Sequence, residues 1–411
     1  MRELGGIFRA HGKKAYLVGG AVRDMVLGQT PADYDLATDA KPEEVTRIFK
    51  RVIPTGIKHG TVTVRHKGRS IEVTTFRTDG LYTDGRRPDS VSYAATIDED
   101  LSRRDFTINA MALELPDGNL IDPCGGRADI ERRLIRCVGA SEERFSEDGL
   151  RPLRAIRFCA QLAGFGFTLD DELLAAIPKT LDITAKVSPE RVACELTKTI
   201  SCAAPLEAFR YMEKTGLMRL ILPELATCRA VTQGGLHRFD VLDHSLYALE
   251  WACAHNYPLT IRLAALFHDL GKPACARPGA GKTTFYTHEK ESARLTRALL
   301  FRLRYPNTVI DAVTHLVEEH MFHYTPDWSA GAVRRFIVRA GEDSLEPLFC
   351  LRMADTYAFT REAPPQDLLA DFTARIETVL RESRALSLKD LAINGHDITA
   401  LGITDGKRIG A

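Results

Sequence analysis

The chain has 411 residues, 45% of them hydrophobic and 27% charged, which is the composition of a globular protein of about two to four domains. Its 55 basic and 55 acidic side chains balance to a net charge of +0, so any nucleic acid must bind a local basic face. The nine cysteines include no C-x-x-C pair, which argues against a zinc knuckle or disulfide framework and favours a reducing cytoplasm. No stretch approaches a signal-peptide core or the roughly 20 apolar residues of a membrane helix. We therefore expect a cytoplasmic protein without membrane contact.

The chain begins with mixed strand and helix patterns and continues as helix. Short β-branched or apolar runs predict strands or buried segments at residues 15–18, 60–66, 70–76 and 109–115. Residues 41–52 have the apolar spacing of an amphipathic helix, with Pro42 in its first turn. From about residue 127 onward the pattern is helical, apart from a loop at 272–284 and a linker at 362–366. These patterns predict an α+β head followed by an all-α body.

The segment YLVGGAVRDMVLGQTPADYDLAT (16–38) has the features of a phosphate-binding turn. A strand runs into Gly19-Gly20, where paired glycines allow the backbone to approach a ligand closely. The helix that follows offers free N–H groups to a phosphate, and Arg23 in its first turn would bind the same anion. An ordinary strand–turn–helix is the alternative.

Two carboxylates follow this turn at a spacing that suits a metal. Asp33 and Asp35 lie two apart, so on an extended segment they point to one face. Neighbouring carboxylates repel unless a cation joins them, and their oxygens are ligands that Mg²⁺ prefers. Glu72, a charged residue within an apolar strand, would be a third carboxylate. The alternatives are a polar turn after Pro31 and a solvated strand face.

These motifs are similar to those of class II tRNA nucleotidyltransferases and bacterial poly(A) polymerases, members of the DNA polymerase β superfamily. The resemblance rests first on LVGGAVRD followed by DYDLAT. It continues through HGTVTV, EVTTFR, DGRRPD (84–89), RRDFTINAMA (103–112), IDPCGG (121–126), FSEDGLRPLRAIRF (145–158) and VSPERVACELTK (187–198). It covers about the first 200 residues in family order, and it implies CCA addition to tRNA from CTP and ATP.

The resemblance also maps nucleotide binding onto Arg104, Asp148, Arg151, Arg154 and Arg157, which join Gly20 and Arg23 of the turn. Asp148 and the three arginines that follow it lie at steps of three, on one stripe of a helix. A carboxylate can accept from the exocyclic amine of cytosine or adenine while a guanidinium donates to the adjacent ring nitrogen. Uracil and guanine present the reverse pattern. A solvated, salt-bridged helix face is the alternative, and Pro152 would kink a helix that began earlier than about residue 148.

Histidines and aspartates in the helical body resemble an HD phosphohydrolase domain. Their order is H…HD…H…H…D, at His244, His268, Asp269, His288, His320 and Asp355. Carried over by position, His244, His268, Asp269 and Asp355 would hold one metal, a transition metal such as Ni, Mn, Co or Fe. His288 and His320 would hold a second metal or contact substrate, with His315 as a competing candidate. A structural metal or ordinary core histidines are the alternatives.

The resemblance implies four domains. They are a polymerase-β-like head (1–138), a helical neck (139–200), a helical body (201–360) with an HD domain at about 236–356, and a helical C-terminal segment (361–411). Residues 388–411 resemble the family's C-terminal region, where relatives usually continue as helix, so we expect a shortened tail. In the head, two Mg²⁺ ions about 3.5–4 Å apart would lie on Asp33 and Asp35.

Other activities compatible with the same motifs are poly(A) polymerase and addition of only CC or only A. Complete CCA addition is favoured because the G-R/K-R-F stretch of bacterial poly(A) polymerases is missing at RVIPTGIKHG (51–60). The loop TDGLYTDGRRPD (78–89), whose counterpart CC-only enzymes are thought to lack, is present. Of the proteins of a different class, a tRNA-binding scaffold with an inactive head is disfavoured because every residue that the chemistry requires is in place. An HD phosphohydrolase to which the head delivers RNA is a further alternative.

Overall fold

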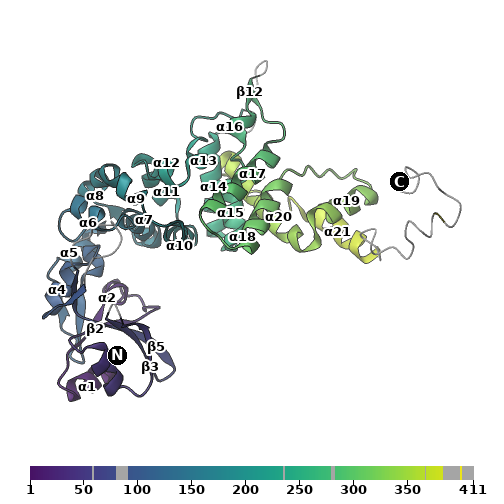
Figure 1. Cartoon of the computed structure of the whole chain (residues 1–411). Helices are drawn as coiled ribbons and strands as arrows, with labels where there is room; N and C mark the ends of the chain where they lie inside the picture. Colours follow the sequence, from purple (N-terminus) through teal and green to yellow (C-terminus); the bar gives the residue numbers. More distant parts are fainter. Residues whose placement is uncertain are drawn as a thin grey trace. The chain divides into compact units, whose positions relative to one another are not determined.

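The structure is a computed structural model, and it describes residues 1–57, 60–79, 91–234, 237–278, 283–365, 367–382 and 399. The chain divides into two compact units (Figure 1). The first comprises Met1–Ala226 with Arg302–Arg304, and the second comprises Thr227–Phe301 with Tyr305–Ala411. Most of the predicted loop at 78–89 and of the C-terminal region at 388–411 lies outside the described residues.

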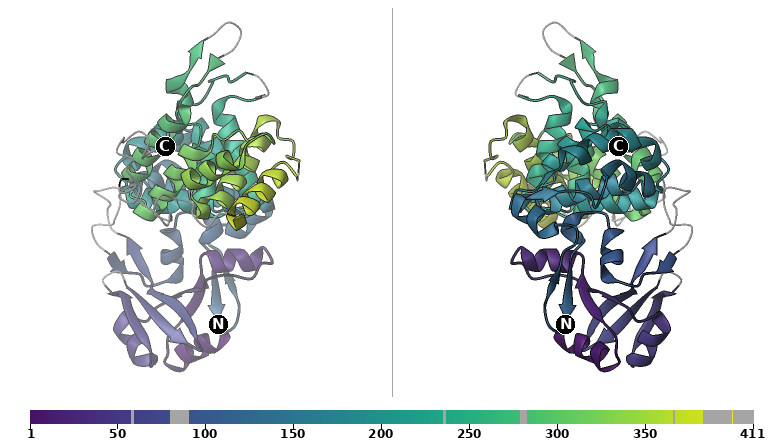
Figure 2. Two further views of the ribbon diagram at one scale, coloured as in Figure 1. Left: turned by 90° about the vertical axis from the view of Figure 1, so that its right-hand side faces the viewer. Right: turned by 90° about the vertical axis from the view of Figure 1, so that its left-hand side faces the viewer.

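A mixed sheet forms the centre of the head. Among the described residues it has seven strands in the order β3-β4-β5-β2-β1-β8-β9. Their bounds are β1 Ala15–Val18, β2 Asp35–Thr38, β3 Val52–Gly56, β4 Thr61–His66, β5 Arg69–Thr75, β8 Ala112–Leu115 and β9 Leu120–Ile121. Neighbouring strands are antiparallel except β2 and β5, which are parallel (Figure 2).

The two faces of this sheet differ along β5, where buried and more exposed residues alternate. Ile71 and Val73 are buried, as are Phe8 and Phe49, whose rings pack at 5.1 Å. The two phenylalanines belong to α1 (Arg2–Ala10) and to the end of α3 (Pro42–Ile48). In β5 the apolar residues occupy alternate positions and are buried. This pattern fixes the pairing register of the strand, because a slip by one residue would turn these side chains toward solvent.

The sequence patterns predict this sheet well but misplace some ends. The strands predicted at 15–18, 60–66 and 70–76 are confirmed. The run 109–115 begins as a 3-10 turn, Thr107–Asn109, and becomes a strand only at Ala112. The helix predicted at 41–52 ends at Ile48, because residues 52–56 form β3 and pair with β4. Tertiary pairing overrides helical spacing at this point.

The head continues in short elements that cover the remaining sheet. Strands β6 (Arg77–Asp79) and β7 (Val91–Tyr93) pair with each other, and α4 (Ile97–Ser102) follows. Leu101 of α4 packs with Tyr16, Val18 and Phe76 in one buried cluster. Helices α2 (Gly20–Val26) and α5 (Gly126–Arg132) complete this part.

The neck is helical, as predicted, apart from a two-stranded pairing at its border. Strand β11 (Thr168–Leu169) lies parallel to β10 (Leu134–Ile135), which the sequence patterns did not predict. The helices of the neck are α6 Ser141–Glu147, α7 Arg151–Gln161, α8 Asp171–Ala176, α9 Leu181–Thr184 and α10 Pro189–Ile200. The first unit continues beyond the neck with α11 Leu206–Lys214, α12 Leu217–Ile221 and α13 Pro223–Ala226. Helix α7 packs against α10 and α11.

The second unit is a helical bundle, as predicted. Its helices are α14 Val241–Ala254, α15 Leu259–Phe267, α16 Lys272–Cys275, α17 His288–Arg302, α18 Asn307–Glu319, α19 Ala330–Ala340, α20 Leu345–Thr360 and α21 Ala370–Glu382. Helix α14 packs against α15 and α20, and α15 also packs against α18. The predicted loop at 272–284 instead contains α16 and a short hairpin of β12 (Arg277–Pro278) and β13 (Thr283–Thr284) (Figure 2). In the described parts, no helix combines the length and the apolar character needed to cross a bilayer.

Helix α21 is held to the second unit by an aromatic cluster. Phe372 is fully buried, and its ring lies 4.1 Å from that of Tyr324, 5.1 Å from Phe336 and 5.6 Å from Trp328. Buried aromatic pairs contribute more than their area alone. This cluster is therefore the main attachment of α21.

We expect Phe372→Ala to destabilise the second unit by about 3–5 kcal/mol, because it removes a buried ring and leaves a cavity. Urea unfolding followed by tryptophan fluorescence will measure this change. Leu368→Ala, a substitution at a position 40% exposed on the same segment, is the matched control and should change stability by less than about 0.5 kcal/mol. Equal effects of the two substitutions would contradict the assigned role of the cluster.

Candidate functional site

The parallel pairing of β2 with β5 brings two of the predicted carboxylates together. Asp35 lies directly opposite Glu72 in the register of this pair, so both side chains point to the same face. Asp33 precedes β2 by two residues, and all three residues are exposed to solvent. In the described part of the first unit, no three metal-ligating atoms from different residues lie within 4.8 Å of one another. The carboxylate oxygens of Asp33, Asp35 and Glu72 therefore do not all lie this close together.

The electrostatics of this group favour a cation. Partial burial of its carboxyl group raises the pKa of Asp35, and the negative charges of Glu72 and Asp33 raise it further. The guanidinium of Arg104 acts in the opposite direction. A divalent cation would remove the mutual repulsion of these carboxylates, so the donor set fits Mg²⁺.

The glycine turn and Arg104 lie next to these carboxylates. Gly19 has a φ of +70°, a left-handed conformation that favours glycine, and it caps α2. A Cβ atom at Gly19 would lie 3.1 Å from Nη1 of Arg104, so the turn and the guanidinium are in close contact. Arg104 donates to the carbonyl of Asn109 at 3.4 Å and to Asp100 at 3.3 Å. These long bonds leave Arg104 able to bind a phosphate at the turn.

Arg23 stabilises the turn through groups of the protein itself. Its side chain is buried, and it donates to Asp24 Oδ1 at 2.7 and 2.9 Å and to Asn109 Oδ1 at 3.0 Å. Its Nη2 atom lies 3.5 Å from the position of a Cβ at Gly20. Arg23 therefore stabilises the turn through Asp24 and Asn109, a structural role that the sequence did not predict. A contact between Arg23 and phosphate would come in addition to this role.

The base-reading segment has a different geometry from the single helical stripe that we predicted. Asp148 follows α6 in an extended conformation, and α7 begins only at Arg151, with Pro152 in its first turn. The proline therefore causes no kink, but Asp148 does not lie on the same helix as the arginines. Asp148 accepts two bonds from Arg191, at 2.8 and 3.1 Å.

The three arginines of α7 are all paired with protein groups. Arg151 donates to the carbonyl of Arg144 at 2.8 Å and to the carboxylate of Glu147. Arg154 donates to Asp105 at 2.7 Å, and Arg157 to Glu195 at 2.5 Å. Burial alone would raise the pKa of Asp105, but Arg154 outweighs this effect and holds it below its usual value.

The partners of these arginines were not predicted from the sequence. They are Asp105, Glu147 and Glu195, and Arg191, the partner of Asp148, was not predicted either. Asp105 and Glu195 lie 49 and 38 residues from the arginines they bind, so no helical spacing relates them. Glu147 lies one turn before Arg151, and this i, i+4 spacing was the one usable signal.

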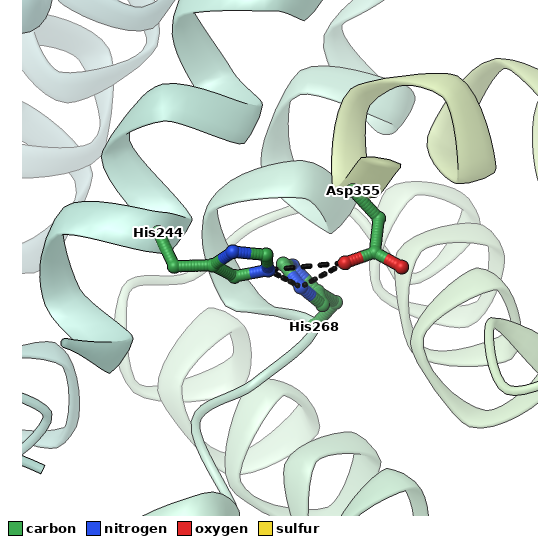
Figure 3. A group of neighbouring side chains, drawn as sticks. All are labelled: His244, His268 and Asp355. Carbon is green, nitrogen blue, oxygen red and sulfur yellow. Dashed lines mark hydrogen bonds and ion pairs between the residues drawn. The ribbon is translucent and has the colours of Figure 1, made fainter. Parts of the chain in front are cut away.

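In the second unit, His244, His268 and Asp355 form one buried group (Figure 3). His244 comes from α14, His268 follows α15, and Asp355 comes from α20. His244 Nε2 lies 3.1 Å from His268 Nε2 and 3.0 Å from Asp355 Oδ1. Two imidazole nitrogens and a carboxylate oxygen converge on one point, as metal ligands do.

Asp269, His288 and His320 form a second buried group beside the first. Asp269 Oδ1 lies 3.3 Å from His288 Nε2 and 3.9 Å from His320 Nε2. Asp269 Oδ2 lies 3.2 Å from His268 Nε2 and 3.5 Å from His244 Nε2, which places this carboxylate between the two groups. The six predicted residues thus come together as two adjoining groups, with Asp269 shared between them.

The protonation pattern leaves one nitrogen of each ring for a metal. The Nδ1 atoms of His268, His288 and His320 lie 2.6–2.9 Å from the carbonyl oxygens of Ala265, Phe285 and Val317. A carbonyl only accepts, so Nδ1 carries the proton and Nε2 is free to ligate. Both carboxylate oxygens of Asp269 and Nε2 of His288 are buried and make no hydrogen bond of good geometry, although Asp269 forms ion pairs with Lys272 and with His288 itself. Such buried unsatisfied atoms fit a site built for a cation.

The charges of this centre support the same interpretation. Burial lowers the pKa of His320 to about 3, so this ring is neutral, whereas Asp269 and Asp355 outweigh the effect of burial on His268 and raise its pKa to about 10. Burial alone would raise the pKa of Asp355, but His244 and His268 outweigh it and hold it well below its usual value. Lys272 Nζ, which the sequence did not single out, lies 2.6 Å from Asp269 Oδ2. Two buried carboxylates thus require positive charge around them.

His315 lies outside the centre, and other residues that we did not predict lie at its border. His315 Nε2 contacts the carbonyl of Ala340 at 2.6 Å. Arg352 donates to Asp355 at 3.1 Å, and the ring of His237 lies 5.0 Å from that of His244. Arg352 lies one helical turn before Asp355, a spacing that would have indicated the contact.

Family models match three consecutive segments of the chain. Residues 15–136 match "Poly A polymerase head domain", residues 166–228 match "Probable RNA and SrmB- binding site of polymerase A", and residues 241–360 match "HD domain". These segments coincide with the sheet, with the helices of the first unit, and with the helices that carry the buried histidines.

Curated relatives align with about half of the chain. The CCA-adding enzyme of Geobacillus kaustophilus is 50% identical over 218 residues, which are 53% of this chain and 53% of the relative. The CCA-adding enzyme of Lactobacillus johnsonii is 49% identical over 206 residues, 50% of this chain and 51% of the relative. The chain thus spans about half the length of the curated relatives it matches.

Solved structures align over almost the whole chain. The CCA-adding enzyme of Bacillus stearothermophilus in complex with CTP is 32% identical, with a TM-score of 0.71, over 99% of this chain and 88% of that one. The Thermotoga maritima CCA-adding enzyme complexed with tRNA is 21% identical, with a TM-score of 0.58, over 100% and 87%, and shares the fold. On the identity and coverage of the first of these structures, the chain belongs to the family of CCA-adding enzymes, and its second unit carries an HD domain.

Proposed function

We propose that the first unit adds CCA to the 3′ end of tRNA, with CTP and ATP as substrates. The observation that carries this proposal is the register of β2 and β5, which places Asp35 opposite Glu72 beside the glycine turn. The family relationship supports it, since relatives are named CCA-adding enzymes and one was solved with CTP. We place the activity in the cytoplasm.

A divalent metal is implied by the family, and we propose Mg²⁺ held by Asp33 and Asp35 with Glu72 as third carboxylate. The metal supplies charge neutralisation at the triphosphate and lowers the pKa of the attacking hydroxyl. Arg104 and the turn at Gly19-Gly20 hold the phosphates from the β1 side, since Arg104 contacts this turn directly. Arg23 keeps the turn in place through Asp24 and Asn109.

Base selection is assigned to Asp148 and Arg151. Asp148 accepts from the exocyclic amine of C or A, and Arg151 donates to the ring nitrogen beside it. Asp148 is bound by Arg191 and Arg151 is bound to Glu147, and we expect both groups to exchange these partners when a nucleotide enters. Arg154 and Arg157 support the α7 surface through Asp105 and Glu195, and would contact phosphate or RNA.

The proposed domain organisation follows the same reasoning. It consists of a head at 1–138, a base-reading neck at 139–200, a body at 201–360 with the HD domain at about 236–356, and a C-terminal segment at 361–411. The family matches at 15–136, 166–228 and 241–360 support this order. Complete CCA addition, rather than CC or A alone, is the output we assign to the head.

We also propose that the HD centre hydrolyses a phosphate ester or a 2′,3′-cyclic phosphate. A cavity of about 760 Å³ is lined by Asp269, His288, His320 and Asp355, so a substrate would reach the buried ligands. Lys272 and Arg352 line the same cavity and would neutralise a phosphate. The imidazole and carboxylate ligands favour a transition metal such as Ni, Mn, Co or Fe.

Asp33→Asn and Asp35→Asn together should abolish nucleotide addition, because they remove the charges that bind the metal, while tRNA binding and folding stay intact. The measurement is incubation with tRNA lacking CCA and with labelled CTP, ATP or both, followed by sequencing of product ends. Glu131→Gln, at an exposed position of α5, is the matched control. CMP addition by the double variant at the rate of the control would rule out this active site.

Asp148→Ala should lower incorporation of CTP and ATP about 10- to 100-fold and raise the relative use of UTP and GTP, because charged hydrogen bonds to the pairing edge are lost. Each of the four nucleotides is tested on tRNA that ends before CCA. Glu143→Ala, an exposed acid on α6, controls for loss of charge. If all four nucleotides weaken equally, Asp148 does not read the base.

His268→Ala with Asp269→Ala should remove bound metal and phosphate-ester hydrolysis but spare CMP addition. Metal content is measured by mass spectrometry, and hydrolysis with a 2′,3′-cyclic nucleotide. His315→Ala, a histidine of the same unit outside the centre, should change neither property. Loss of CMP addition together with hydrolysis in the double variant would point to a structural role for this site instead.

A further inference from the structure

A basic groove lies at the turn that joins β4 to β5, beside the start of β3. It has a volume of about 620 Å³ and reaches α1 and the end of α3. Its apolar lining comes from Ile7, Ile48 and Phe49. The rest of its lining is polar or basic, without an acidic residue: Lys50, Arg51, Arg65, His66, Lys67, Gly68 and Ser70. In a chain of +0 net charge, this is a local concentration of positive charge.

Two arginines of this groove face each other across β3 and β4. The amide of Arg65 donates to the carbonyl of Arg51 at 2.9 Å, and the next residues pair as Val52 with Val64. Both side chains are exposed, and neither has an acidic partner among the residues that the structure describes. Like charges directly opposite each other in a sheet destabilise it, so the fold itself does not explain this pair.

An acid is available at the same end of the sheet, but it pairs elsewhere. Glu3 accepts from Lys67 at 2.5 Å and lies 3.4 Å from His66. Arg51 and Arg65 thus keep their charge open to solvent, while the only acid that contacts this turn is bound to Lys67 and His66 in the part of the chain that the structure describes. An external anion that bridged them would relieve their repulsion.

The groove begins close to the catalytic carboxylates. Arg65 pairs with Ser70, and Thr63 pairs with Glu72, so Arg65 and Ser70 share the face of Glu72. Ser70 is two residues, or about 7 Å, from Glu72 along the strand. The guanidinium of Arg69 also lies 5.6 Å from the ring of Tyr34, the residue between Asp33 and Asp35.

The strand order separates this groove from the phosphate turn. Strand β2 carries Asp35, with β1 and its Gly19 turn on one side and β5 and β4 on the other. In nucleotidyl transfer the attacking oxygen and the leaving pyrophosphate lie roughly in line on opposite sides of the phosphorus. If the triphosphate occupies the β1 side, the attacking RNA strand approaches from the side of β5 and β4.

We propose that this groove binds the phosphate backbone of the tRNA acceptor strand just before its 3′ end, with Arg51 and Arg65 contacting phosphate oxygens. The proposal rests on the proposed nucleotidyl transfer. Guanidinium groups suit bidentate phosphate contacts, and such contacts position a strand without reading its sequence. The exposed, paired arrangement of the arginines fits a continuous polyanion better than a single nucleotide.

The test uses the full chain and fluorescently labelled tRNA lacking CCA, with binding measured by anisotropy at several salt concentrations. Arg51→Ala with Arg65→Ala should reduce the slope of log affinity against log salt by about one per lost contact, thus by about two. The double lysine variant keeps the charge and should restore the slope. Arg127→Ala with Arg132→Ala, two exposed arginines of α5, is the matched control.

The KM for tRNA should rise in the double alanine variant, while the KM for CTP should not. An equal rise in both would place the arginines at the triphosphate and overturn the proposal, as would an unchanged salt slope. A melting temperature below that of the control, without rescue by lysine, would show a structural role and also overturn it. Wild-type protein that binds tRNA with this slope but adds no nucleotide would contradict the proposed function and leave the groove assignment standing.

Discussion

The parallel pairing of β2 with β5 is the constraint on which the first unit depends. It places Asp35 and Glu72 side by side, although they are 37 positions apart in the chain, and their repulsion creates the demand for a cation. The same pairing sets β1 and its glycine turn on one side of the carboxylates and the β4–β5 hairpin on the other. A single register therefore sets the relative positions of the proposed metal ligands, the glycine turn and the basic groove.

Positive charge in this unit is held in place by buried acids. Arg154 and Arg157, with Asp105 and Glu195, form ion pairs in which the acids are at most 10% exposed. Breaking such a pair is costly because it leaves an unpaired buried charge, so each pair fixes the orientation of its arginine. The groove pair of Arg51 and Arg65 is the opposite case, since both charges remain open to solvent. This contrast separates arginines whose orientation is fixed by buried acids from arginines whose charge is open to solvent.

In the second unit, too, acidic side chains are paired with positive charge, but here both partners are buried. Asp269 and Asp355 lie within the bundle, so their charge must be met by histidines, by Lys272 or by a metal. Carbonyl acceptors at Nδ1 of the rings leave Nε2 directed at Asp269. The helices that supply these ligands pack through apolar residues, and their close packing makes the ligand atoms converge.

The sequence by itself determined the α+β head, the helical body and the six residues of the HD centre, because strand alternation, glycine turns and ordered motifs are local signals. It did not determine that Asp148 lies outside helix α7, since a residue at the end of a helix has no periodicity of its own. It also did not reveal the partners Arg191, Asp105 and Glu195, nor the opposition of Arg51 and Arg65. These contacts join residues distant in the chain, and only strand register and helix packing decide which charges meet.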